Sequence, residues 1–218
     1  NDVGGPTANM YGFECGRKMA KGVCDHKRCM SSSICQTLKP THKPQIDILK
    51  NLRKLSGVKK VFVSSGIRYD MILEDERYGD AYLQELVEHH VSGQLKVAPE
   101  HTDDRVLRLM GKPNIGSLLE FKKRFDKKSK RAGKNQFLTY YFIAAHPGSR
   151  ESDMRKVQQF VSRELKLHPE QVQIFTPTPG TWAAVMYWSG IDPFTGNKIY
   201  VEYDPRKKER QKRIVTGG

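Results

Sequence analysis

Residues 137–145 read Phe137-Leu138-Thr139-Tyr140-Tyr141-Phe142-Ile143-Ala144-Ala145, nine positions that are nearly all apolar or aromatic. Such a continuous run is typical of a strand that is buried on both faces of a parallel sheet. Proline and glycine follow at once, in His146-Pro147-Gly148. The run therefore predicts a central strand of an α/β fold, with a loop at its carboxyl end.

Three shorter segments predict further strands of the same sheet: Lys60 to Ser64, Gln94 to Ala98 and Gln171 to Phe175. Each is mostly apolar or β-branched and is bounded by turn residues. Four or five strands are too few for a complete eight-stranded barrel, which needs about 250 residues. We therefore expect part of a (β/α) barrel, with ligands at the carboxyl ends of its strands.

Helical patterns separate the predicted strands. Ser117 and Glu120 have the spacing of a capping box, which predicts that a helix begins just before Phe121. The other predicted helices cover residues 46–55, 83–90, 106–110 and 154–165. Strands that alternate with helices indicate a parallel sheet covered by helices.

The chain has 218 residues, 37% of them hydrophobic, which suits one domain over 1–195 and a basic extension over 196–218 that we expect to be partly disordered. The formal net charge is +14. Residues 120–134 carry eight basic and two acidic residues, and residues 204–213 carry six and two. These two stretches fit a solvated helix face and a mobile tail, or a surface that contacts RNA or another polyanion.

No apolar run approaches the roughly 20 residues of a membrane span, and no signal peptide opens the sequence. We therefore expect a cytoplasmic protein without a membrane partner. The sequence opens on Asn1 rather than Met, which we interpret as a boundary inside a longer protein.

All four cysteines, Cys15, Cys24, Cys29 and Cys35, lie in an insertion over residues 11–41 that shows no clear periodicity. Clustered thiols on a loop with little core favour zinc or an iron–sulfur cluster, with His26 or His42 as a substitute ligand. Two disulfides or four free buried thiols are the alternatives, and a cytosolic location disfavours disulfides.

A series of motifs resembles the YgiQ-like radical S-adenosylmethionine (SAM) proteins. It begins with Asp2-Val3-Gly4-Gly5-Pro6-Thr7-Ala8-Asn9-Met10-Tyr11 and continues, in the order of that family, over most of residues 1–195. The later motifs are Ser64-Ser65-Gly66-Ile67-Arg68-Tyr69-Asp70, Lys96-Val97-Ala98-Pro99-Glu100-His101-Thr102, Leu109-Met110-Gly111-Lys112-Pro113, Ala145-His146-Pro147-Gly148-Ser149 and Thr176-Pro177-Thr178-Pro179-Gly180-Thr181.

The resemblance implies a partial barrel, truncated at its N-terminal side, from an enzyme that uses a [4Fe–4S] cluster, SAM and an external electron donor. In that family a C-x3-C-x2-C loop binds the cluster, and SAM is cleaved reductively to a 5′-deoxyadenosyl radical. The four cysteines here have 8, 4 and 5 residues between them, so the cluster ligands match no residue of this chain. The chain alone is therefore expected to be inactive, and its substrate is unknown.

The resemblance also implies a set of SAM-binding residues: Gly4, Gly5, Pro6, Ser64, Ser65, Arg68, Glu100, Pro177 and Gly180. The same residues also fit tight barrel loops without a ligand. His101 and His146 fit either loop caps or substrate contacts. Because consecutive parallel strands end at one rim, we expect Arg68 and Glu100 to face the same cavity.

A different class of function remains open, a non-enzymatic zinc-stabilised α/β module that binds RNA through residues 122–134. An ordinary α/β scaffold without a cofactor is the third alternative.

Overall fold

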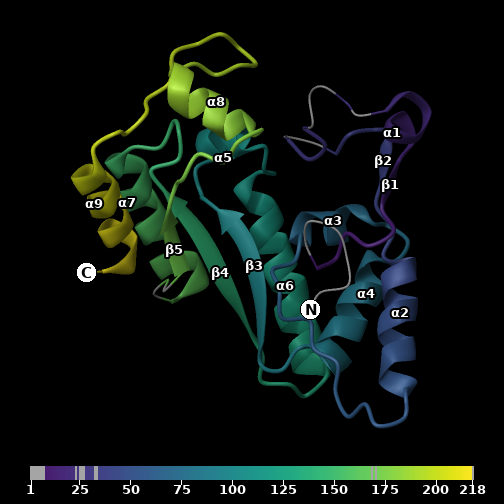
Figure 1. Ribbon diagram of the computed structural model, residues 1–218. Coiled ribbons are helices and arrows are strands. Elements are labelled where there is room, and N and C mark those ends of the chain that lie inside the picture. The colour runs from purple at the N-terminus through teal and green to yellow at the C-terminus, as the bar shows by residue number, and fades with distance from the viewer. Residues whose placement is uncertain are drawn as a thin grey trace. The chain divides into compact units, whose positions relative to one another are not determined.

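The computed structural model describes residues 8–22, 24, 28–31, 34–167, 169 and 171–217. Figure 1 shows the helices and the small sheet of this α/β chain. The predicted α/β class is therefore confirmed. The partial barrel stays a prediction, because the strands of the described residues make a three-stranded sheet, in the order β3-β4-β5, and a two-stranded ribbon.

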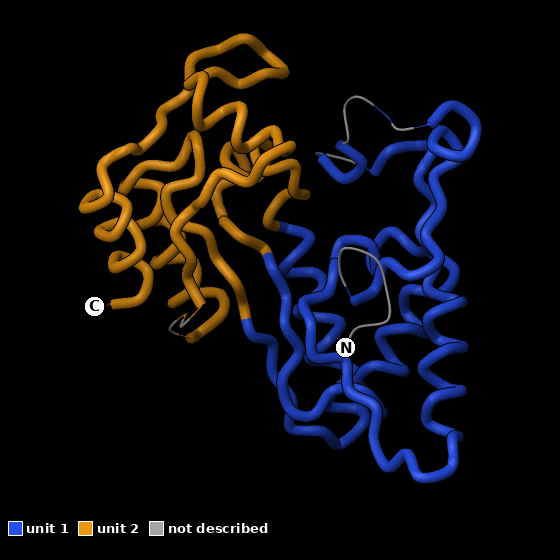
Figure 2. The backbone as a smooth tube through the Cα atoms, viewed as in Figure 1, with its two compact units in different colours: residues 1–98, 116–139 blue, residues 99–115, 140–218 orange. Residues whose placement is uncertain are grey.

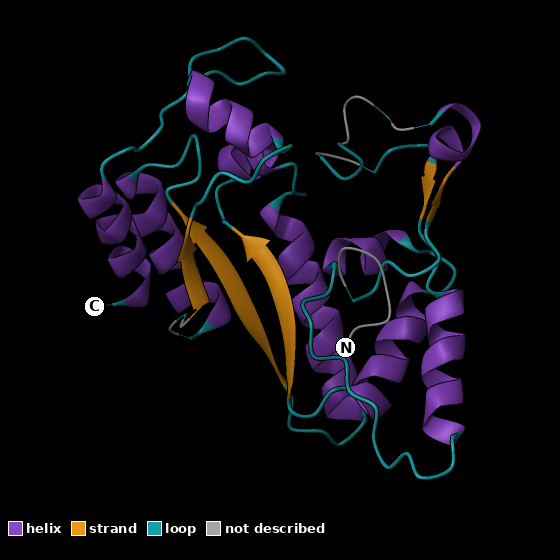
Figure 3. Cartoon of the chain, viewed as in Figure 1, coloured by secondary structure: helices purple, strands orange, loops and turns teal. Residues whose placement is uncertain are grey.

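The three sheet strands lie where the apolar runs predict them. They are β3 (Gln94–Glu100), β4 (Phe137–Ala144) and β5 (Gln171–Ile174). Strands β4 and β5 are parallel, with Tyr141 opposite Gln171 and Ala144 opposite Ile174. Alternate residues of β4 are buried, and Phe142 and Ala144 are fully enclosed. The arrows in Figure 3 follow this sheet to its carboxyl ends.

The chain divides into two compact units, which are blue and orange in Figure 2. Unit 1 comprises residues 1–98 and 116–139. Its helices are α1 (Gly16–Lys21), α2 (Lys43–Lys54), α3 (Tyr69–Glu74), α4 (Gly79–Glu85), η1 (Leu86–His90) and α6 (Ile115–Arg131), of which α6 begins one residue before the unit boundary. Helix α6 buries Leu118, Phe121 and Phe125 at the spacing of one helix face.

Unit 2 comprises residues 99–115 and 140–218. Its helices are α5 (Asp104–Met110), α7 (Glu151–Phe160), η2 (Val161–Leu165), α8 (Trp182–Ser189) and α9 (Pro205–Thr216). Helix α9 packs against α7 and β5. None of the helices in the described part of the chain combines the length and apolar composition that a membrane span needs.

Three local predictions are wrong. Residues 60–64 form no strand; nearby, Ile67 pairs with Val97 in a single parallel bridge. Ser117 does not cap a helix, because α6 begins earlier, at Ile115, whose backbone N–H donates to Asp104 Oδ1 at 2.8 Å.

The third correction concerns the basic extension, which is not disordered over residues 205–216. Asp204 caps helix α9 by accepting from the backbone N–H of Arg206, Pro205 occupies its first turn, and Gly217 ends it. Its buried side, Gln211 and Val215, holds the helix against the unit.

Candidate functional site

Two adjacent loops of unit 2, residues 100–103 and 145–149, form what we call the strand-end site. They follow β3 and β4 directly. Glu100 and Ala145 have φ values of 67° and 58°, in the left-handed region that residues other than glycine rarely adopt. Such strain costs on the order of 1 kcal/mol per residue and gathers at ligand-binding loops.

Charged and hydrogen-bonding groups hold both strained residues. Glu100 Oε1 lies 2.9 Å from Lys112 Nζ, and both side chains are mostly buried. The backbone N–H of Ala145 donates to Gln211 Oε1 of α9 at 3.1 Å. The strand-end conformation is therefore maintained by contacts from α9 and from the turn after α5.

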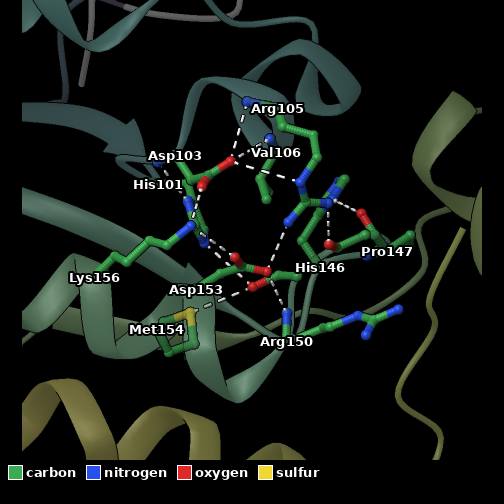
Figure 4. A network of polar contacts seen from close by, with 12 residues as sticks. His101, Asp103, Arg105, Val106, His146, Pro147, Arg150, Asp153, Met154 and Lys156 are labelled. Carbon is green, nitrogen blue, oxygen red and sulfur yellow. Dashed lines mark hydrogen bonds and ion pairs between the residues drawn. The ribbon is translucent and has the colours of Figure 1, made fainter.

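His101 is buried and its tautomer is set by its neighbours (Figure 4). The backbone N–H of Asp103 donates to Nδ1 at 3.0 Å, so the ring proton is on Nε2, which donates to Ser149 Oγ at 3.2 Å. Ser149 in turn donates to Met154 Sδ at 3.5 Å. Because the serine oxygen accepts from the ring and has no base beside it, this pair does not have the arrangement of a nucleophilic serine.

His146 is also buried, and its Nδ1 donates to the Pro147 carbonyl at 2.9 Å, which leaves Nε2 as the acceptor. Burial lowers the pKa of His101 to about 4, although the negative charges of Asp103 and Asp153 act to raise it. Burial likewise lowers the pKa of His146 to about 4, opposed by its bond to Pro147 and by Glu100. Both rings are neutral at physiological pH.

An ion-pair network joins α5 to α7 across the strand-end site (Figure 4). Arg105 donates from Nη1 to the Gly148 carbonyl and from Nη2 to Asp153 Oδ2, each at 2.7 Å. Asp153 also accepts from the backbone N–H of Arg150 at 3.0 Å, and Lys156 Nζ lies 3.1 Å from Asp103 Oδ2. Asp103 caps α5, so one network fixes two helix starts and the loop at Gly148.

A second buried network lies in unit 1, where Asn9 pairs with the backbone of Arg68. The Asn9 amide donates to the Arg68 carbonyl at 2.9 Å and accepts from its N–H at 2.7 Å. The amide also lies 3.1 Å from His42 Nε2, and His42 Nδ1 lies 2.8 Å from Asp75. This chain of bonds anchors the segment that follows the glycine motif to the loop at Arg68.

The predicted SAM-binding residues are distributed over both units. Gly4, Gly5 and Pro6 lie outside the described residues; Ser64, Ser65 and Arg68 belong to unit 1, and Glu100, Pro177 and Gly180 to unit 2. Arg68 donates to both carboxylate oxygens of Asp70, which orients its guanidinium. Gly180 has a φ of 75°, which explains the glycine. A shared cavity for Arg68 and Glu100 stays a prediction.

The four cysteines all belong to unit 1. Cys15 ends β1 (Glu14–Cys15) just before α1, and the other three lie between α1 and β2 (Leu38–Lys39). All four are free thiols. Contact with the Thr37 hydroxyl and with nearby backbone N–H groups lowers the pKa of Cys15 and of Cys35. Burial and the other three cysteines raise the pKa of Cys29.

The two predicted substitute ligands, His26 and His42, have different outcomes. His42 is held by Asn9 and Asp75, and His26 lies outside the described residues. Among the residues that the structure describes, no three His, Cys, Asp or Glu side chains already have the spacing of metal ligands.

The basic run at 120–134 lies mostly on α6. Lys123, Lys127 and Lys130 are exposed at the spacing of one helix face, and Lys134 follows beyond the helix end. RNA contact through this run stays a prediction.

Sequence reasoning missed Asn9, Lys112, Ser149 and Asp153 as members of these networks. Only the Asp153 position had a local signal, an acidic residue in the first turn of α7. The other partners are far apart in the sequence, for example Ser149, which lies 48 residues from His101.

The chain is similar in sequence to part of several longer proteins. A UPF0313 protein of Fusobacterium nucleatum is 52% identical over 216 residues, which are 99% of this chain and 38% of that protein. Over nearly its whole length, the chain is therefore similar to part of a UPF0313 protein. A UPF0313 protein of Thermotoga neapolitana is 46% identical over 214 residues, and one of Clostridium perfringens is 44% identical over 211. The chain spans 37% and 31% of these two UPF0313 proteins. No family model matches the chain.

Proposed function

We propose that this chain is part of the core of a radical SAM enzyme and that its strand-end site contacts SAM or the substrate in the intact protein. The observation that carries the proposal is the left-handed conformation of Glu100 and Ala145 at the ends of neighbouring strands. In α/β folds, ligands bind beyond the carboxyl ends of the strands, and strained backbone is retained where a ligand needs it. The series of motifs in family order supports the same assignment.

The groups present fit SAM better than they fit the cluster. The Glu100 carboxylate, held by Lys112, would accept hydrogen bonds from a ribose hydroxyl or an ammonium group. Ser64 and Ser65 would add hydroxyl groups from the segment before the Ile67–Val97 bridge, and Arg68 would face the carboxylate of SAM. Pro177 and Gly180 would lie beside its adenine. Gly4, Gly5 and Pro6 complete the proposed set.

The cluster would be held outside these residues, since no C-x3-C-x2-C occurs in the sequence. When bound and reduced by an external electron donor, cluster and SAM would together supply a 5′-deoxyadenosyl radical. The strand-end site of unit 2 would contribute part of the pocket's wall. His101 and His146 would stay neutral there, and the ion pairs of Arg105 would keep the loop at Gly148 in place.

Reductive cleavage of SAM tests the proposal. The intact protein, reconstituted anaerobically with iron and sulfide and supplied with dithionite, should release 5′-deoxyadenosine. The 218-residue chain, treated identically, should release no more than a protein-free control, because it lacks the cluster loop. Glu100→Gln in the intact protein should raise the KM for SAM. An intact, cluster-loaded protein that never cleaves SAM, or a chain that does so alone, would contradict the proposal.

A further inference from the structure

We call the described residues of 13–40 the cysteine ribbon. Two of its thiols, those of Cys15 and Cys35, come close together near the two ends of this segment. Cys15 Sγ and Cys35 Sγ lie 3.5 and 3.3 Å from the same Thr37 hydroxyl. Cys15 lies opposite Leu38 in the antiparallel pair, which places it beside the residues that follow Cys35. Cys29 is attached to this pair through its carbonyl, which accepts from the backbone N–H of Cys35 at 2.8 Å.

Backbone hydrogen bonds join the same two segments. The Thr37 carbonyl accepts from the N–H of Gly16, the residue after Cys15, at 3.0 Å. The Cys35 carbonyl accepts from the N–H of Leu38 at 2.9 Å. Cys15 and Cys35 are therefore held close to one residue, Thr37, by backbone as well as side-chain contacts.

Packing orders only a small part of the ribbon. Met30 is buried, but helix α1 has no buried residue, and Met19 is 74% exposed. The strands β1 and β2 are two residues each. A segment with so little core needs a cross-link of another kind, as small metal-bound domains do.

We propose that Cys15, Cys24, Cys29 and Cys35 bind one zinc ion, with four sulfur ligands and no open position. Cys15 and Cys35, which already share the Thr37 hydroxyl, would supply two of the four ligands. Cys24 and Cys29 would move to ligand distance when zinc binds, since metal sites are seldom fully formed without metal. Binding releases the thiol protons and leaves a site of charge −2. Arg17, Lys18 and Lys21 of the ribbon offset that charge. The site is separate from the cluster and SAM of the proposed function and serves to fix the ribbon.

Metal analysis of the purified 218-residue chain tests this directly, because these are its only four cysteines. We expect one zinc per chain, no acid-labile sulfide, and release of that zinc when an organomercurial modifies the four thiols. Cobalt(II) in place of zinc should give the absorption of tetrahedral thiolate coordination.

Cys24→Ser and Cys29→Ser should each weaken zinc binding by more than about 100-fold in competition with a chelator, beyond what loss of an outer-shell partner typically causes. Met19→Ser is the matched control. Met19 lies on the same ribbon, is 74% exposed and is not a proposed ligand, so this variant should keep one zinc. Iron with sulfide in the wild-type chain, four freely reactive thiols after zinc loading, or undiminished affinity in the serine variants would overturn the proposal.

Discussion

Lowering the pH from 7.5 to 5 is expected to reduce the free energy of unfolding by about 4 kcal/mol, through His101 and His146. Each has a pKa of about 4 in the folded chain, below the roughly 6.5 of an exposed histidine. Between these values the unfolded state binds more protons, so stability falls as the pH falls. At pH 7.5 both histidines are neutral in the folded and the unfolded state, so they do not reduce stability. At pH 5 each is protonated in the unfolded state but still mostly neutral in the folded state, which lowers the free energy of unfolding by about 2 kcal/mol per histidine.

Urea unfolding at both pH values measures this effect. His101→Asn keeps an acceptor for the Asp103 backbone N–H but cannot take up a proton in this range, so it should remove about half of the acid loss. His89→Asn is the control, because that ring is more exposed and lies in unit 1. An acid loss that is equal in wild type and His101→Asn would show that His101 is not buried in the neutral form.

Phe121→Ala is expected to cost about 3–5 kcal/mol of unfolding free energy, as is usual for a fully buried phenylalanine. Phe121 is 0% exposed, and its ring centroid lies 5.8 Å from that of Tyr69 and 6.4 Å from that of Phe125. Tyr69 begins α3, directly after Arg68, so the cavity should also loosen the loop that carries Arg68.

The matched control for Phe121→Ala is Lys123→Ala, on the exposed side of the same helix, which should change stability by no more than about 0.5 kcal/mol. Denaturant midpoints of the two variants and the wild type measure the difference. Similar midpoints for Phe121→Ala and Lys123→Ala would mean that α6 does not bury the face described above.

Strands β3, β4 and β5 could be predicted from local sequence. β4 is a nearly continuous apolar run, and in β3 and β5 buried apolar residues alternate with polar ones. Residues 60–64 have apolar residues too, but Phe62 is 48% exposed and only Val63 is buried, so no strand face is enclosed. The many charges of residues 205–216 favour disorder, so composition did not predict helix α9. The residues that begin and end the helix, Asp204, Pro205 and Gly217, are typical of helix ends and are the better guide to its structure.

The sequence predicts where the candidate site lies, at the carboxyl ends of the strands, but not which residues hold it in place. Glu100 and His146 lie where the strand–loop pattern puts them, but the partners that fix them come from distant residues. Lys112 follows α5 and Gln211 lies on α9, and no local pattern links either residue to a strand end. Backbone strain at Glu100 and Ala145 is likewise a product of the folded chain, because neither residue type favours a positive φ.

Hydrogen exchange on the intact, cluster-loaded protein, with and without SAM, tests the strand-end assignment most directly. SAM should slow exchange of the backbone amides in residues 100–103 and 145–149, and of those at 64–68 and 176–181. The amides of the cysteine ribbon should be unaffected, because its metal site is separate. Unchanged exchange in all four segments at saturating SAM, or protection confined to the ribbon, would contradict the account.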